Sequence, residues 1–95
     1  MDMQQIDFLK RLAQGIALQF GSNCEVVVHD LQSKDPAHTI VAIENGHITG
    51  RSIGDGPSNV VLKALHSNPE KLHDSPSYLT KTEDGKILKS TTIYL

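Results

Sequence analysis

The stretch IVAIENGHITGR, residues 40–51, predicts where the chain reverses direction. Apolar residues run up to Asn45-Gly46 and resume directly after it. Asn-Gly between two such runs is the strongest short-range signal of a β-hairpin, since a type I′ turn needs a positive φ at both central residues. The expected cross-strand pairs are Glu44 with His47, Ile43 with Ile48 and Ile40 with Arg51, and the expected core face is Val41, Ile43 and Ile48.

The segment before this turn predicts a helix followed by a strand. Hydrophobic residues recur at helical spacing between Asp2 and Phe20. Asp2 followed three residues later by Gln5 matches a capping box, and Gly21 suits a left-handed turn that ends the helix. Valine-rich CEVVVHDL then predicts a buried strand over residues 24–30, with Val26 and Val28 on one face and Val27 and His29 on the other.

The segment after the turn predicts short helices and a second hairpin. Gly54 and Gly56 permit a turn ahead of a helix that opens at Pro57, and Asn68-Pro69 begins another short helical turn. SYLTKTEDGKILKSTTIYL, residues 77–95, predicts a hairpin around Asp84-Gly85 whose inward face is not evident. The order of elements predicts an α+β fold built on one antiparallel sheet.

Size and composition predict one soluble domain, residues 1–95, in the cytoplasm. The chain has 95 residues and 38% hydrophobic content, which suits a single core. Its one cysteine, Cys24, excludes an internal disulfide, and no apolar run is long enough to span a bilayer. The net charge of -2, with both signs interspersed, lacks the basic face that DNA binding needs.

Three segments together resemble the YheO-like PAS domain: FGSNCEVVVHDL at 20–31, IVAIENGHITGRSIGD at 40–55 and KTEDGKILKSTTIYL at 81–95. In that family the domain is the N-terminal sensory half of bacterial transcription regulators, and a DNA-binding helix-turn-helix follows it. The resemblance implies a PAS-like antiparallel β-sheet flanked by an N-terminal helix and short helices. The family pattern continues with a further strand and the helix-turn-helix, so we expect this chain to lack the last strand and to present an open sheet edge.

Four polar residues are the candidate ligand-binding site: His29, Asn45, His47 and Arg51. The planar donor fork of arginine suits a carboxylate, so this cluster predicts a pocket for a small anionic ligand. The simpler alternative is that His29 hydrogen-bonds within the sheet while Asp30 begins a turn, and that His47 only pairs with Glu44 at the surface. The helix start at Pro57 is a second place for an anion.

The sequence does not favour catalysis or a metal site. Side chains of adjacent strand residues point to opposite faces, so His29 and Asp30 do not form a hydrolase pair. Cys24 and His29 are five strand residues apart, roughly 16 Å, which is too far for a nucleophile and its base. The five histidines lack the paired spacing of a zinc motif.

We therefore expect a non-enzymatic sensory domain of a DNA-binding transcription regulator. It binds an unknown small molecule, forms a homodimer, or does both, and no cofactor is indicated by the residues. The alternative is a dimerisation module without a ligand, and an enzyme ranks third. DNA contact is expected only through a helix-turn-helix that this chain does not contain, and no membrane contact is expected.

Overall fold

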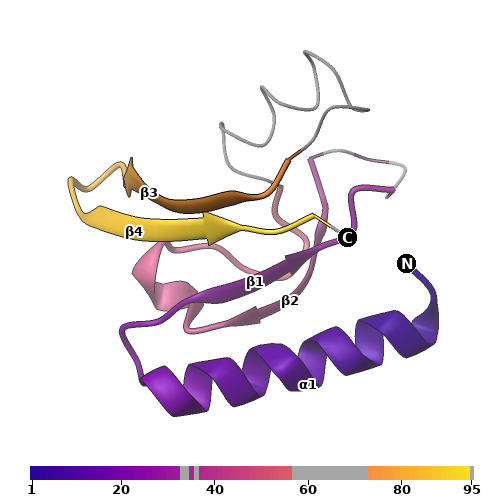
Figure 1. Cartoon of the computed structure of the whole chain (residues 1–95). Coiled ribbons are helices and arrows are strands. Elements are labelled where there is room, and N and C mark those ends of the chain that lie inside the picture. Colours follow the sequence, from indigo (N-terminus) through magenta and orange to yellow (C-terminus); the bar gives the residue numbers. More distant parts are fainter. Residues whose placement is uncertain (33–34, 36, 57–72, 95) are drawn as a thin grey trace. The chain divides into compact units, whose positions relative to one another are not determined.

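The computed structural model describes residues 1–32, 35, 37–56 and 73–94 (Figure 1). The chain divides into two compact units, Met1–Ser58 and Asn59–Leu95, and each is described by itself. The predicted helix at Pro57 and the turn at Asn68-Pro69 lie outside the described residues. Together the elements form the α+β fold that the sequence predicts, although its strands appear as two antiparallel pairs.

Helix α1, Met3–Phe20, begins and ends where the sequence predicts. The Asp2 side chain accepts a hydrogen bond from the Gln5 backbone, and the Gln5 side chain accepts one from the Asp2 backbone, which confirms the capping box. Gly21 ends the helix with a φ of 87°, a value that favours glycine. Its ψ of -171° is extended, so the expected left-handed helical conformation does not form.

Helix α1 packs against a pair of antiparallel strands in the first unit (Figure 1). Strand β1, Val26–His29, pairs with β2, Ile40–Glu44, and the register shifts between Val28 and His29. The described hydrophobic core is small and joins the helix to β2: its members are Ala13, Ala17, Ile40 and Ala42. This small core makes the polar contacts around it important for holding α1 and the strands together.

The predicted hairpin at Asn45-Gly46 is wrong. Strand β2 pairs with β1, and the chain after Asn45 continues as a short 3₁₀ helix, η1, Gly46–Ile48. Asn45 has the positive φ of a type I′ turn, 56°, but Gly46 does not, and that turn requires both. The residues that the hairpin placed opposite each other are therefore paired differently: Glu44 lies opposite Val26 and Ile43 opposite Val27.

The core face of β2 is also corrected. Ile40 and Ala42 are buried, while Val41, Ile43 and Ile48 are only half-buried. The side facing the core was misassigned because the expected strand partner was absent and the true partner is β1. The chain does return beside the start of β2, as a loop: the Asp55 carbonyl accepts from the backbones of Thr39 and Ile40 at 2.9 Å each.

The two glycines of that returning loop have the turn role predicted for them. Gly54 has a φ of 92°, and its backbone donates to the Ile40 carbonyl. A Cβ at Gly56 would lie 2.9 Å from the Ala37 carbonyl oxygen, so only glycine fits this close approach. These contacts bring the loop after η1 back to β2.

The second unit contains the predicted hairpin. Strands β3, Ser75–Lys81, and β4, Ile87–Thr92, pair antiparallel around Asp84-Gly85. The Thr82 backbone donates to the Lys86 carbonyl at 2.9 Å, and Gly85 has a φ of 90°. Leu79 and Ile87 are exposed, whereas Tyr78 and Leu88 are half-buried.

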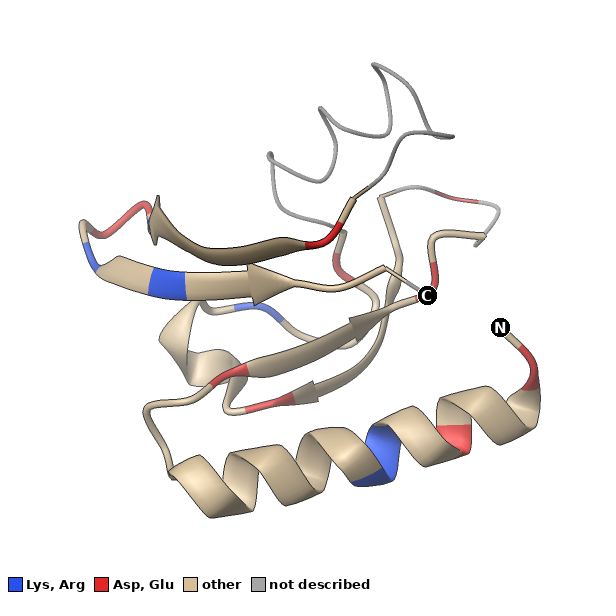
Figure 2. Cartoon of the chain, in the orientation of Figure 1, with Lys and Arg blue, Asp and Glu red and all other residues tan. Residues whose placement is uncertain are grey.

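Charges of both signs are mixed in each unit. Figure 2 shows acidic and basic residues interspersed on α1 and around the turn of the β3–β4 hairpin. Neither of these elements therefore carries a stripe of one sign. Among the described residues, no helix is long and apolar enough to cross a membrane.

Candidate functional site

Arg51 is held by an ion pair inside the first unit. Its Nη2 atom lies 2.6 Å from Oε1 of Glu25, and its Nε donates to the Thr49 hydroxyl at 3.0 Å. Thr49 donates to the other Glu25 oxygen from its hydroxyl at 2.7 Å and from its backbone at 3.1 Å. The Glu25 side chain is 8% exposed and that of Arg51 is 28% exposed. The guanidinium thus neutralises an internal carboxylate of the chain.

Glu25 was missed at the sequence level because the predicted hairpin placed Arg51 opposite Ile40. The available signal was a single acidic residue directly before the hydrophobic start of a strand, Glu25 before Val26. A buried carboxylate needs a cationic partner, and Arg51 supplies it because η1 turns the chain back toward the beginning of β1.

His29 forms a hydrogen bond with a buried hydroxyl at the start of β2. Its Nδ1 atom lies 2.7 Å from Oγ1 of Thr39, which is 1% exposed. Burial, together with the positive charge of Arg51, lowers the pKa of His29 to about 4. The imidazole is therefore neutral at neutral pH and serves as a hydrogen-bond partner within the fold.

Asp30 begins a turn, as the simpler interpretation predicts. Its side chain accepts a hydrogen bond from the Gln32 backbone at 3.0 Å. This is the local carboxylate-to-backbone contact typical of aspartate in turns. Both residues of the His-Asp dipeptide thus have a structural role.

Asn45 ties the end of β2 to the turn between α1 and β1. Its Nδ2 atom donates to the carbonyls of Gly21 at 3.1 Å and Cys24 at 2.8 Å. His47 lies on η1 and is exposed. Of the four predicted site residues, the structure thus brings His29 and Arg51 within electrostatic reach, while the Asn45 side chain is bonded to the Gly21 and Cys24 carbonyls.

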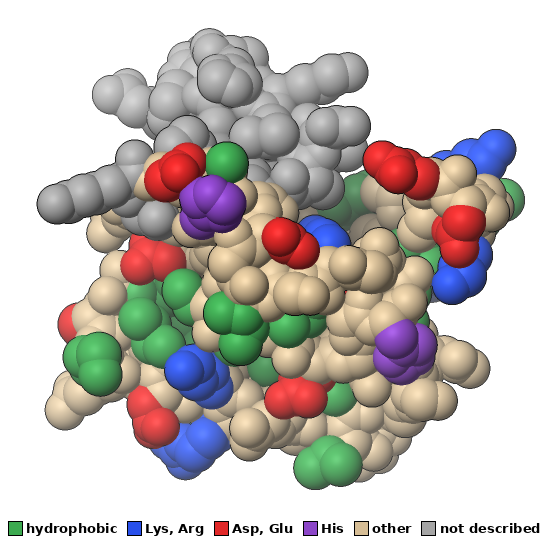
Figure 3. All heavy atoms as spheres, turned by 180° about the vertical axis from the view of Figure 1, so that it is seen from behind, with side chains coloured by type: hydrophobic (Ala, Val, Ile, Leu, Met, Phe, Trp, Pro, Cys, Tyr) green, Lys and Arg blue, Asp and Glu red, His purple; other side chains and the backbone are tan. Residues whose placement is uncertain are grey.

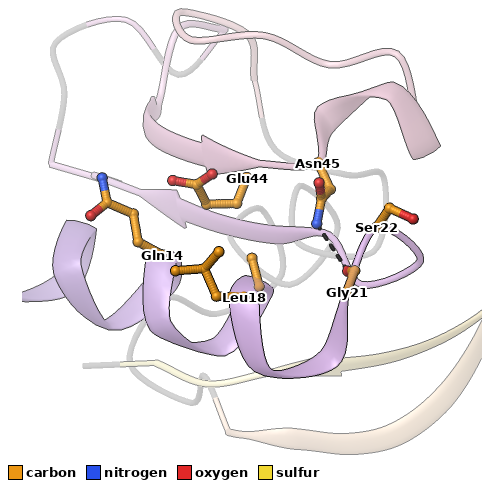
Figure 4. Close-up of a pocket in the computed structure, with 7 residues that line it drawn as sticks. Gln14, Leu18, Gly21, Ser22, Glu44 and Asn45 are labelled. Atoms are coloured by element: carbon orange, nitrogen blue, oxygen red, sulfur yellow. Dashed lines mark hydrogen bonds between the residues drawn. The ribbon is translucent and has the colours of Figure 1, made fainter.

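An open cleft of about 450 Å³ lies beside Asn45, between α1 and the end of β2 (Figure 4). Figure 4 shows Glu44 turned toward Gln14 and Asn45 turned toward Gly21. The cleft is lined from the helix, the following turn and the strand end by Gln14, Ala17, Leu18, Ser22, Glu44 and Asn45. A smaller depression of about 200 Å³ continues along α1 and β2 and shares Gln14 and Glu44 with the cleft.

This cleft was not predicted, apart from Asn45. Gln14 and Leu18 are four residues apart and therefore lie on one face of α1. The sequence offered no reason to place that face beside Glu44, because the strand pairing that positions Glu44 was misassigned. Within the described residues, no group of three or more His, Cys, Asp or Glu side chains is arranged to hold a metal ion.

The PAS-like α+β fold agrees with the comparison of the whole chain with protein families. The model of the YheO-like PAS domain matches residues 1–95, and the chain belongs to that family. PAS domains are generally regulatory and not catalytic, so membership indicates a regulatory domain.

The names of the similar curated proteins assign them no function. The chain is 35% identical to "Uncharacterized protein YheO" of Escherichia coli K12, over 97% of this chain and 39% of that protein, and equally to the Shigella flexneri protein of that name. It is 29% identical to an uncharacterised protein of Haemophilus influenzae, over 97% of this chain and 40% of that protein. The chain therefore spans about two fifths of the length of these relatives. No solved structure matches it.

Proposed function

We propose that the chain is the non-enzymatic sensory domain of a DNA-binding transcription regulator, and that it binds a small molecule in the cleft between α1 and β2. Family membership supports the regulatory role. The volume of the cleft, about 450 Å³, supports the ligand, because small-molecule sites typically occupy roughly 300 to 1,000 Å³. Contact with DNA belongs to a part of the regulator outside this chain.

The position of the cleft links ligand binding to the spacing of α1 and β2. Its walls come from α1 and from the end of β2, which the Asn45 side chain links through the Gly21 and Cys24 carbonyls. A ligand that touches both walls favours one spacing of helix and strand over others. Such unequal binding to two conformations is what shifts an equilibrium in a regulator.

Retention of a small molecule from a cell extract tests the proposal. The purified chain is incubated with the small-molecule fraction of a bacterial extract, separated from unbound material by size, and its bound compounds are identified by mass spectrometry. We expect a compound that is retained by the wild type and by Leu12→Arg but not by Leu18→Arg. Leu18 is 85% exposed and lines the cleft, so the charged residue blocks binding without burying a charge. Retention of no compound, or equal retention by both variants, contradicts the proposal.

A second candidate function, dimerisation without a ligand, is favoured by the exposed hydrophobic side chains of α1. Phe8 and Leu12 are 55% and 46% exposed and lie four residues apart on one helix face. Figure 3 shows hydrophobic side chains exposed among acidic and basic ones on the face of the molecule seen there. A contiguous patch of exposed hydrophobic residues is typical of protein interfaces, and this candidate requires that Phe8 and Leu12 form part of one.

Light scattering over a range of protein concentrations tests this second candidate. The dimerisation candidate predicts a dimer that Leu12→Arg converts to a monomer and that Leu18→Arg leaves intact. The Leu18 variant therefore tests ligand binding and is the control for dimerisation. The Leu12 variant tests dimerisation and is the control for ligand binding. A wild-type monomer at every concentration contradicts dimerisation through this face.

A further inference from the structure

Glu44 is a half-buried carboxylate without a partner in the described part of the chain. It lies at the end of β2 and lines both the cleft and the smaller depression beside it. Among the described residues, no hydrogen bond or ion pair satisfies its side chain. Glu25, by contrast, is neutralised by Arg51 and bonded by Thr49. A carboxylate that is partly removed from water is stabilised by a cation that reaches it.

The other polar groups of the cleft also suit a ligand that donates hydrogen bonds more than a ligand that accepts them. Because the Asn45 Nδ2 atom donates to two backbone carbonyls, its Oδ1 atom is the one left to accept a hydrogen bond. Ser22 and Gln14 are neutral, and the formal charge of the lining residues is that of Glu44 alone. Lys10 lines the adjacent depression, but it forms no ion pair with Glu44.

We propose that the cleft binds a small organic cation, a primary ammonium group attached to an aliphatic chain. The ammonium group pairs with the Glu44 carboxylate, and the aliphatic part lies against Leu18 and Ala17 on α1. This inference rests on the proposed sensory function and specifies its ligand. The proposed ligand contacts Glu44 and not Arg51, whose guanidinium is paired with Glu25. It is a cation, whereas the sequence predicts an anion.

Amide NMR titrations of the chain with three probes of similar size test the charge preference: n-butylammonium, n-butanol and butyrate. We expect n-butylammonium to cause saturable shifts at the backbone amides of Gln14, Ser22 and Asn45, with the alcohol and the carboxylate binding about tenfold more weakly or worse. Equal binding of the three probes, or no saturable shift with n-butylammonium, overturns the inference.

Two variants test whether Glu44 causes the preference for n-butylammonium. Glu44→Gln keeps the size of the side chain and removes its charge, and we expect it to weaken n-butylammonium binding about tenfold while n-butanol binding is unchanged. Glu83→Gln, at an exposed position in the β3–β4 turn, should bind as the wild type does. Unaltered n-butylammonium binding by Glu44→Gln overturns the inference. If the extract yields a cleft-dependent compound without an ammonium group, the sensory function stands and this assignment of the ligand is wrong.

Discussion

Arg51 acts on stability through the carboxylate that it neutralises. Removing it leaves Glu25, 8% exposed, with only the Thr49 contacts. Breaking a buried pair in this way typically costs several kcal/mol, because an uncompensated charge stays behind. We therefore predict that Arg51→Ala lowers the free energy of unfolding by about 3 kcal/mol, measured by urea denaturation.

Arg11→Ala is the matched control for this prediction. Arg11 pairs with Asp7 on the surface of α1, where the two side chains are 67% and 72% exposed, so its loss should cost less than about 1 kcal/mol. Adding Glu25→Gln to Arg51→Ala should restore part of the lost stability, since it removes the stranded charge. Equal effects of Arg51→Ala and Arg11→Ala would show that the internal pair does not stabilise the unit.

His29 links stability to pH. The unfolded chain takes up this proton near pH 6.5, and the folded chain only near pH 4, because burial and Arg51 disfavour the imidazolium. Above about pH 6.5 both states are neutral at His29, so the residue contributes no pH dependence there. As the pH falls from about 6.5 to about 4, the unfolded state binds more protons and the folded state loses stability; below that range the loss is constant.

Thermal melts of the wild type and His29→Gln over this pH range measure the effect. We predict that the melting temperature of the wild type falls more steeply on acidification than that of the variant. His47→Gln, which changes an exposed histidine, should keep the slope of the wild type. Parallel curves for the wild type and His29→Gln would contradict the assigned role of His29.

At the scale of elements, Gly15 and Gly46 differ in whether their surroundings leave room for a side chain. Gly15 lies within α1, and an added Cβ meets no atom within 4 Å, whereas a Cβ at Gly46 would lie 2.6 Å from the Arg51 carbonyl oxygen. We predict that Gly15→Ala raises the free energy of unfolding by about 0.5 to 1 kcal/mol, because alanine favours the helix. Gly46→Ala should lower it by about 1 to 3 kcal/mol, because the backbone of η1 must shift.

Urea denaturation of both variants measures these opposite signs. Hydrogen exchange then locates the second effect: in Gly46→Ala, the amides of Ile48 and Gly50, bonded to Asn45 and Gly46, should lose protection. A Gly46→Ala protein as stable as the wild type would mean that η1 does not have the conformation described here.

The elements that were predicted from the sequence are those fixed by nearby residues. Asp2 and Gln5 cap α1 through contacts three residues apart, and Gly85 supplies the positive φ of its own hairpin. The turn at Asn45-Gly46 has an equally strong local signal, yet distant contacts override it. Asn45 bonds to carbonyls more than twenty residues away in sequence, and Glu25 binds both Thr49 and Arg51.

The same reason limits what could be predicted of the site. His29, Asn45 and Arg51 were singled out for their chemistry, and the structure gives each a partner within the fold. The cleft residues Leu18 and Glu44 have no distinctive motif and become neighbours only through the packing of α1 beside β2. Whether any of the predicted residues contacts a ligand stays a prediction for the binding experiments above.

For the whole molecule, we propose that a regulatory domain of the YheO-like PAS family uses the cleft of its first unit to bind a small molecule. Exposed hydrophobic residues on the outer surface of α1 support association as a second role. The two roles are compatible, because Leu18 lines the cleft while Phe8 and Leu12 do not.

Native mass spectrometry of the purified chain, compared with its denatured mass, tests both roles in one experiment, because one spectrum reports both bound ligand and oligomeric state. We predict an excess mass of one small molecule per chain that is lost in Leu18→Arg and kept in Leu12→Arg. A chain whose native mass equals one or two copies of the polypeptide alone, even after incubation with cell extract, would contradict the sensory account.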